Sequence, residues 1–235
     1  MEQRRQVTLL GDSILKGIQV DLGSRRYKPQ NEMNVDALES EFQLSIHNDA
    51  HFGATVRKGS RLLDRMLERQ LPCDMLVMDF GGNDCDFKWK EIAEHPEADH
   101  QPNVPLPEFV ELYRGMIRRV RSHGIRPILT NLSPLDSERF FNWWCGDLDK
   151  DAVLRWLGDV GNIYAWQERY SRAVERLAQE EQVPLVDVRG AFLDHGHLEQ
   201  TLCADGTHPN TLGQGLITAA FQNFGRSLRL AGQTV

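Results

Sequence analysis

Five short apolar runs alternate with amphipathic, helix-forming segments along the 235-residue chain, and this alternation is the feature that most restricts its fold. Each run has the length and composition of a strand. Strands that alternate with helices favour a parallel sheet with helices on both faces. We therefore expect an α/β fold with a five-stranded parallel sheet. Because no linker, repeat or low-complexity tract divides the chain, we expect one domain over residues 1–235. The expected strands are residues 6–10, 42–47, 74–80, 126–132 and 183–188.

Two segments interrupt the alternation and are interpreted as insertions. One lies near residues 85–106 and is rich in charge and proline, and the other lies near 134–161 and is rich in aromatic side chains. The aromatic residues are expected either to line a substrate pocket or to pack the insertions onto the domain. Nearer the start, residues 14–19 are predicted to form a short helix and residues 22–35 a polar loop. The aromatic residues in question are Phe87, Trp89, Trp143, Trp144 and Trp156.

The net charge of −7 argues against a nucleic acid or an anionic membrane as partner. No apolar run reaches the length of a membrane span, and no apolar leader segment follows Met1, so we expect a cytoplasmic protein without membrane association. The four cysteines are scattered and form no C-x-x-C pair, which fits free thiols in a reducing compartment. We expect no cofactor.

Residues that can carry chemistry follow four of the five expected strands. Ser13 follows the first strand, Gly53 the second, Asn83 the third, and Asp205 and His208 the fifth. In an open parallel sheet, ligands bind beyond the carboxyl ends of the strands, near the point where strand order reverses. These distant residues are therefore expected to converge at one edge of the sheet.

The converging residues are those that a nucleophilic serine needs. A serine hydroxyl becomes reactive when a neighbouring base takes its proton, and His208 is the candidate base because imidazole titrates near neutral pH. Asp205, three residues earlier, can orient that imidazole through its other ring nitrogen. The backbone amides of Ser13 and Gly53 and the side-chain amide of Asn83 are candidate donors to the oxyanion.

Each of these segments also has a structural interpretation when it is taken alone. Ser13 can serve as a helix cap, Gly53 and the segment 81–84 suit turns, and the segment 205–210 can introduce the last helix. Their joint occurrence, in order and at successive strand ends, favours catalysis.

A metal site and a cysteine nucleophile are two further hypotheses for this chain. Acidic residues flank Cys85, and His95 and His100 follow, but the spacing is not that of a metal site, so we expect no bound metal. No histidine–aspartate pair is assigned to Cys85, which argues against a thiol nucleophile.

The chain resembles the SGNH hydrolase superfamily, also called the GDSL esterase/lipase family, in four motifs that span nearly its whole length. The resemblance implies a flavodoxin-like three-layer α/β/α fold and metal-independent ester hydrolysis through an acyl-serine. It also implies that Ser13 is the nucleophile, His208 the base and Asp205 its partner, with Gly53 and Asn83 as oxyanion donors. One departure is Ser-Ile-Leu-Lys in the first motif, where the family name derives from Ser-Leu. The motifs are Gly11-Asp12-Ser13, Gly53, Gly81-Gly82-Asn83-Asp84 and Asp205-Gly206-Thr207-His208-Pro209-Asn210.

We therefore expect a serine hydrolase whose partner is a small-molecule ester. The expected substrate has a short acyl group, such as acetyl, on a carbohydrate or another small polar molecule. Two alternatives stay open: a thioesterase or lysophospholipase that uses the same site, and a catalytically silent binding module that keeps the fold.

Overall fold

A twisted parallel sheet forms the centre of the molecule in the computed structural model, which describes residues 4–21, 26–29 and 34–230. Its order is β4-β1-β5-β6-β7, and every neighbouring pair is parallel. This is the strand order of flavodoxin-like folds, and it reverses between β1 and β5. The predicted five-stranded parallel sheet is confirmed. The strands are β1 (Arg5–Gly11), β4 (Leu44–Asn48), β5 (Met75–Asp79), β6 (Arg126–Thr130) and β7 (Leu185–Val186).

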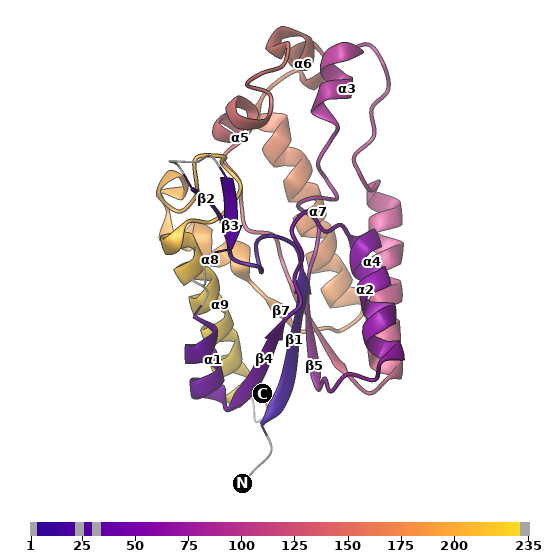
Figure 1. The fold of residues 1–235 in the computed structure, drawn as a ribbon, viewed down its shortest axis with the longest axis vertical. Coiled ribbons are helices and arrows are strands. Elements are labelled where there is room, and N and C mark those ends of the chain that lie inside the picture. The colour runs from indigo at the N-terminus through magenta and orange to yellow at the C-terminus, as the bar shows by residue number, and fades with distance from the viewer. Residues whose placement is uncertain (1–3, 22–25, 30–33, 231–235) are drawn as a thin grey trace.

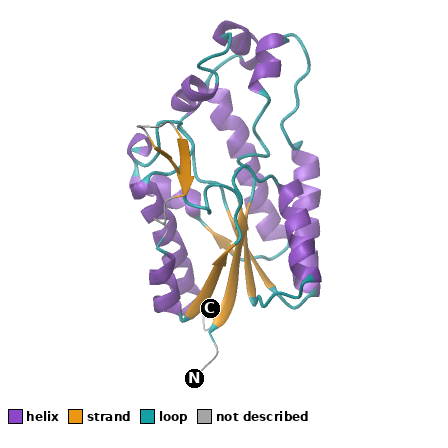
Figure 2. Cartoon of the chain, in the orientation of Figure 1, coloured by secondary structure: helices purple, strands orange, loops and turns teal. Residues whose placement is uncertain are grey.

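Successive side chains of each strand enter two separate apolar layers, as the period of two in a strand requires. In β5, Leu76 and Met78 join the core formed with α2, α4 and α7, whereas Met75 and Val77 join the core formed with α1, α8 and α9. Helices therefore cover both faces of the sheet (Figure 2). The helices are α1 (Val35–Phe42), α2 (Val56–Glu68), α4 (Leu106–Ser122), α7 (Gly161–Glu180), α8 (Val188–His195) and α9 (Thr211–Leu230).

A third apolar cluster lies beyond the carboxyl edge of the sheet and is built from the two predicted insertions. Their helices, α3 (Trp89–Glu94), α5 (Ser137–Trp144) and α6 (Lys150–Leu157), pack together with the start of α7 (Figure 1). The insertions are thus ordered helical segments, and they stand over the edge at which the candidate site residues were expected to meet.

The segment after β1 departs from the prediction. The helix expected at residues 14–19 is replaced by a turn and by β2 (Ile18–Asp21), which pairs antiparallel with β3 (Arg26–Pro29). β3 lies inside the segment predicted to be a loop; residues 22–25 and 30–33 of that segment lie outside the described residues. Strands of four residues contain too few alternations to be recognised by period alone.

The fifth strand is also shorter than predicted, with two residues instead of the expected 183–188. It ends because Asp187 caps the next helix, its side chain accepting a hydrogen bond from the backbone N–H of Gly190 at 2.8 Å.

In the described part of the chain, no helix combines the length and apolar character that a membrane span needs.

Candidate active site

Ser13, Asp205 and His208 form a continuous hydrogen-bonded series at the carboxyl edge of the sheet. Nε2 of His208 lies 2.9 Å from Oγ of Ser13, and Nδ1 of His208 lies 2.6 Å from Oδ2 of Asp205. The exposed fraction is 6% for Ser13, 3% for His208 and 0% for Asp205. Because an ionised carboxylate only accepts hydrogen bonds, it places the imidazole proton on Nδ1 and leaves Nε2 to accept from the Ser13 hydroxyl.

The Asp205 carboxylate also holds the turn that carries His208. Its Oδ1 accepts hydrogen bonds from the backbone N–H groups of Thr207 and His208, both at 3.1 Å. Gly206 adopts a φ of 71°, and a Cβ there would lie 2.6 Å from the carbonyl oxygen of Asp136. A glycine is therefore needed at the bend, both for its conformation and for its lack of a side chain.

The environment of Asp205 favours its ionised form. Burial by itself would raise the pKa of this carboxyl, but the hydrogen bond and charge of His208 and the two backbone N–H groups outweigh burial and hold the pKa below its ordinary value. A charged Asp205 is the state that can stabilise a protonated His208.

Asp12 holds the turn in which Ser13 lies. Its Oδ1 accepts a hydrogen bond from the backbone N–H of Ile14 at 2.8 Å, which closes an Asx turn directly after β1. The carbonyl of Ser13 accepts from the N–H of Ile18 at 3.0 Å, so the turn is tied to β2 as well. Gly11 precedes it in contact with β5, where a Cβ would lie 3.0 Å from the carbonyl oxygen of Asp79.

Asn83 lies beside the Ser13 turn and the loop after β4. Its Nδ2 donates to Oδ2 of Asp12 at 2.9 Å and to the carbonyl of Ala54 at 3.2 Å. Asn103 donates to the Asn83 carbonyl at 2.9 Å and so fixes the backbone there. Gly53, next to Ala54, has a left-handed φ of 66°. The structure thus brings Asn83 and the Gly53 loop together next to the turn of Ser13.

Three buried carboxyls near this point favour the neutral form more than ordinary aspartates do. Burial, followed by the nearby charge of Asp79, raises the pKa of Asp12 well above its ordinary value. Burial raises the pKa of Asp79 to about 6, although the Thr130 hydroxyl donates to this carboxyl at 2.7 Å. Burial raises the pKa of Asp84 to about 7, although Asp84 accepts from the backbone N–H of Val56 at 2.9 Å. Neutral carboxyls reduce the negative charge that a developing oxyanion would meet.

A cavity of about 250 Å³ opens beside Ser13 and His208, and most of its wall is apolar. Both insertions contribute aromatic side chains to this cavity. Phe87, Trp89 and Trp144 line it, which was one of the two interpretations of the aromatic residues. The other interpretation holds for Trp156, which packs against Phe87 at a ring-centroid distance of 5.1 Å. Trp166 of α7 was not predicted to reach the site. The aromatic side chains lining the cavity are Phe52, Phe87, Trp89, Phe140, Trp144 and Trp166.

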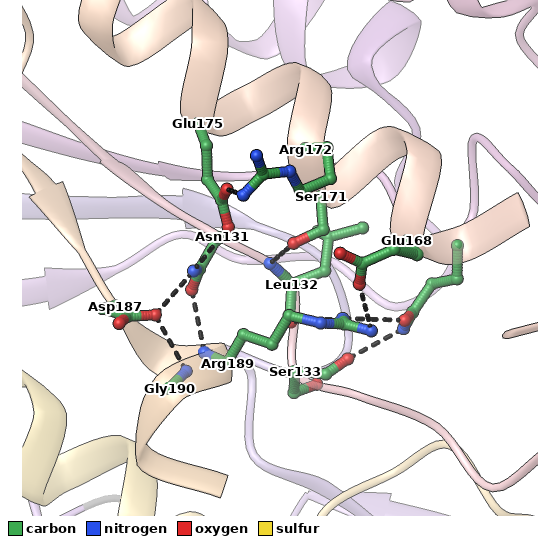
Figure 3. Close-up of polar contacts among 11 residues, drawn as sticks. Asn131, Leu132, Ser133, Glu168, Ser171, Arg172, Glu175, Asp187, Arg189 and Gly190 are labelled. Atoms are coloured by element: carbon green, nitrogen blue, oxygen red, sulfur yellow. Dashed lines mark hydrogen bonds and ion pairs between the residues drawn. The ribbon is translucent and has the colours of Figure 1, made fainter. Parts of the chain in front are cut away.

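The polar part of the cavity wall follows β6 and is held by a buried arginine (Figure 3). Nη1 of Arg189 donates to the Leu132 carbonyl at 3.1 Å and to Oε1 of Gln167 at 3.0 Å. Gln167 in turn donates to the Ser133 carbonyl at 2.8 Å. Glu168 neutralises the arginine, with an N–O distance of 2.7 Å. Leu132, Ser133 and Gln167 line the cavity, so this network fixes its shape.

Cys85 lines the same cavity, but its environment is not that of a nucleophile. Burial raises the pKa of this thiol well above its ordinary value, and the thiol donates to the Gly82 carbonyl at 3.2 Å. A neutral thiol is a weak nucleophile. Within the ranges 4–21, 26–29 and 34–230, no group of three or more histidine, cysteine or acidic side chains is arranged to hold a metal ion.

Comparison with solved structures gives the same fold over nearly the whole chain. A lipase/acylhydrolase from Enterococcus faecalis is 20% identical, with a TM-score of 0.63 over 94% of this chain and 96% of that one. A catalytic mutant of an acetylxylan esterase from Geobacillus stearothermophilus is 18% identical, with a TM-score of 0.66 over 95% of each chain. At these identities the likeness establishes the fold.

Sequence comparison is more specific about the family. The chain is 29% identical over 175 residues to the isoamyl acetate-hydrolyzing esterase of Saccharomyces cerevisiae; the alignment covers 73% of this chain and 66% of the yeast protein, slightly less than two thirds of its length. The model of the GDSL-like lipase/acylhydrolase family matches residues 9–216, a range that contains all five candidate site residues. The chain therefore belongs to the GDSL-like lipase/acylhydrolase family.

Proposed function

We propose that this protein hydrolyses carboxylic esters through an acyl-serine intermediate formed on Ser13. The observation that carries the proposal is the series from Ser13 through His208 to Asp205, which opens into an aromatic-lined cavity. His208 Nε2 takes the hydroxyl proton as Ser13 Oγ attacks the ester carbonyl, and then passes that proton to the departing alkoxide. Water, deprotonated by the same imidazole, attacks the acyl-serine, and His208 returns this proton to Ser13 Oγ as the acid leaves.

The negative charge of each tetrahedral intermediate needs fixed donors. We assign this role to the backbone amides of Ser13 and Gly53 and to Nδ2 of Asn83. The bond from Asn83 to Asp12, at 2.9 Å, keeps the side-chain amide oriented, while the longer 3.2 Å bond to Ala54 is the one that an oxyanion would replace. Hydrogen bonds of this kind often tighten only when substrate is bound.

The size of the cavity supports a substrate with a short acyl group. Its volume of about 250 Å³ lies below the roughly 300–1,000 Å³ typical of pockets for drug-sized ligands. The yeast relative is named for hydrolysis of an acetate ester, which agrees with a short acyl group. For the alcohol we propose a carbohydrate or another small polar molecule, because Asn131 and Gln167 add polar groups to the wall.

A second activity, cleavage of thioesters or lysophospholipids with longer acyl chains, is favoured by one observation. Most of the cavity wall is apolar and includes several aromatic side chains, and such a surface binds alkyl chains. A series of 4-nitrophenyl esters of increasing acyl length separates the two candidates. Our proposal predicts the highest kcat/KM with acetate or propionate, whereas the alternative predicts that kcat/KM rises with chain length.

The test of the nucleophile is a fluorophosphonate probe followed by peptide mass spectrometry. The probe is expected to modify Ser13 in the intact protein and to leave Ser13→Ala unmodified. A folded wild-type protein that takes no label at Ser13 would contradict the proposed function and would favour a binding module that keeps the fold.

A further inference from the structure

Tyr27 lies against the candidate base, although no sequence motif connects it with the site. It is carried by β3 of the hairpin, and its ring centroid lies 5.1 Å from that of His208, with an interplanar angle of 52°. On its other sides it stacks on Trp144 at 6.0 Å and contacts Phe52 at 5.4 Å. Phe52 is itself stacked on His208 at 6.1 Å. The three rings therefore contact one another, and the imidazole packs against two aromatic rings that come from separate segments.

The hydrogen bonds of the Tyr27 hydroxyl have a defined direction. Nε1 of Trp143 lies 2.9 Å from this hydroxyl, and an indole N–H can only donate, so the phenol oxygen accepts this bond. The single phenol proton is then free to point at the Asp205 carboxylate, whose charge acts on Tyr27. Burial, followed by the charge of Asp205, raises the pKa of Tyr27 above its ordinary value, so the hydroxyl keeps its proton. The titratable groups that face Tyr27 are His208, Asp205 and the Cys203 thiol.

We propose that Tyr27 is a positioning residue for the Ser13 site, its hydroxyl donating to Asp205 while its ring holds the imidazole of His208 toward Ser13. In this arrangement Asp205 accepts from the Tyr27 hydroxyl in addition to Nδ1 of His208, and Trp143 only holds the phenol oxygen. This inference rests on the proposed ester hydrolysis and adds the hairpin to the machinery of that reaction.

The hydroxyl and the ring have separate consequences. The hydroxyl shares the negative charge of Asp205 and so moderates how strongly Asp205 holds a protonated imidazole. Without it, the protonated imidazole is held more strongly, and the base becomes free only at a higher pH. The ring restricts the imidazole to the orientation in which Nε2 faces Ser13, a contribution to preorganisation.

The test is Tyr27→Phe, which keeps the ring and removes only the hydroxyl. With 4-nitrophenyl acetate we expect kcat to fall roughly tenfold with little change in KM, the scale of one lost hydrogen bond to a charged group. We also expect the midpoint of the acid limb of kcat/KM to move to higher pH. A wild-type kcat and an unmoved midpoint would overturn the proposal.

The matched control is Trp143→Phe, which removes the indole donor and leaves the bond from Tyr27 to Asp205. It is expected to keep the wild-type midpoint, and an upward shift as large as that of Tyr27→Phe would overturn the assignment to the hydroxyl. A second readout is the far-downfield proton NMR signal of the Nδ1–H of His208, which is expected to move in Tyr27→Phe and not in Trp143→Phe. An unmoved signal in Tyr27→Phe overturns the proposal even if kcat falls.

The failure of this proposal is distinguishable from the failure of ester hydrolysis. Fluorophosphonate labelling of Ser13 reports the proposed function in the wild-type protein. If Ser13 is labelled and Tyr27→Phe has no effect, the proposal for Tyr27 is wrong and the hydrolase assignment stands. If wild-type Ser13 is not labelled, the proposed function fails first, and the proposal for Tyr27 fails with it.

Discussion

Nε2 of His208 lies 2.9 Å from Oγ of Ser13, although 195 positions separate the two residues. The contact arises because β1 lies in the centre of the sheet and Ser13 follows its carboxyl end directly. His208 reaches the same edge from the turn that precedes α9, and Asp205 keeps that turn in shape. The contact between Ser13 and His208 therefore depends on the order of the strands in the sheet and on the hydrogen bonds of Asp205 within the turn.

The substitution Asp205→Asn is expected to lower kcat strongly without unfolding the protein. An asparagine oxygen can still accept from the backbone N–H of Thr207, but the neutral amide cannot hold the proton on Nδ1 of His208 or stabilise the imidazolium. In a triad of this type the loss is roughly 10⁴ in kcat. The measurement is 4-nitrophenyl acetate hydrolysis beside circular dichroism. A folded variant with kcat within tenfold of wild type would remove Asp205 from its proposed role.

The substitution Asn83→Ala is expected to lower kcat by roughly 10²–10³, the usual loss for one oxyanion donor, with a small change in KM. The matched control is Asn103→Ala, because Asn103 donates to the Asn83 carbonyl but offers nothing to the substrate. The control is expected to lose much less activity. Equal losses in the two variants would show that Asn83 acts through loop structure alone, and the comparison needs only steady-state kinetics.

The parallel sheet and the convergence of the site could be predicted from the sequence because neither depends on side-chain detail. Apolar runs separated by amphipathic helices fix a parallel arrangement, and parallel strands bring their carboxyl ends to one edge. The order of the strands in the sequence is enough to predict Ser13, Asn83 and His208 at that edge. The structure places all three on the wall of one cavity.

The role of the hairpin that carries Tyr27 could not be predicted, since the contacts of Tyr27 are with residues far along the chain. Tyr27 and Trp143 are 116 positions apart, and neither lies in a recognisable motif. The buried arginine at position 189 was missed for the same reason. Its partners lie in the segment after β6 and on α7, and a single arginine gives no periodic signal.

The substitution Arg189→Met is expected to lower the free energy of unfolding by about 1–3 kcal/mol, the cost of leaving buried acceptors without their donor. Arg189 is 4% exposed, and its loss leaves the Leu132 carbonyl and Gln167 Oε1 without their donor. The measurement is equilibrium unfolding in urea. A matched control is Arg172→Met, which breaks the pair between the exposed Arg172 and the partly buried Glu175 within α7.

Exposed pairs contribute about 0–1 kcal/mol, so Arg172→Met is expected to be nearly neutral. The double variant Arg189→Met with Glu168→Gln is expected to recover part of the loss, because it no longer leaves an unpaired carboxylate. Equal unfolding free energies for Arg189→Met and Arg172→Met would contradict the role of Arg189 in holding the cavity wall.

The Arg189→Met substitution is also expected to raise KM, since Gln167 and Ser133 lose their fixed positions.

The substitution Asp84→Asn is expected to change how stability depends on pH. Burial raises the pKa of Asp84 to about 7 in the folded protein, above its value in the unfolded chain. Between these two values the folded state binds more protons, so this group's contribution to stability is complete below about pH 4 and is lost as pH rises toward 7. Asparagine keeps the acceptor for the Val56 N–H and does not titrate.

The Tm of Asp84→Asn is therefore expected to match the wild-type Tm near pH 4 and to exceed it near pH 8, with a difference set by about 1.4 kcal/mol for each unit of pKa shift. An exposed carboxylate, removed in Asp194→Asn, is the control and is expected to leave the wild-type pH profile in place. Thermal unfolding followed by circular dichroism measures all three proteins. A constant difference between the Asp84→Asn and wild-type Tm values from about pH 5 to pH 8 would show that Asp84 does not take up a proton on folding. The inference that this buried carboxyl favours its neutral form would then be wrong.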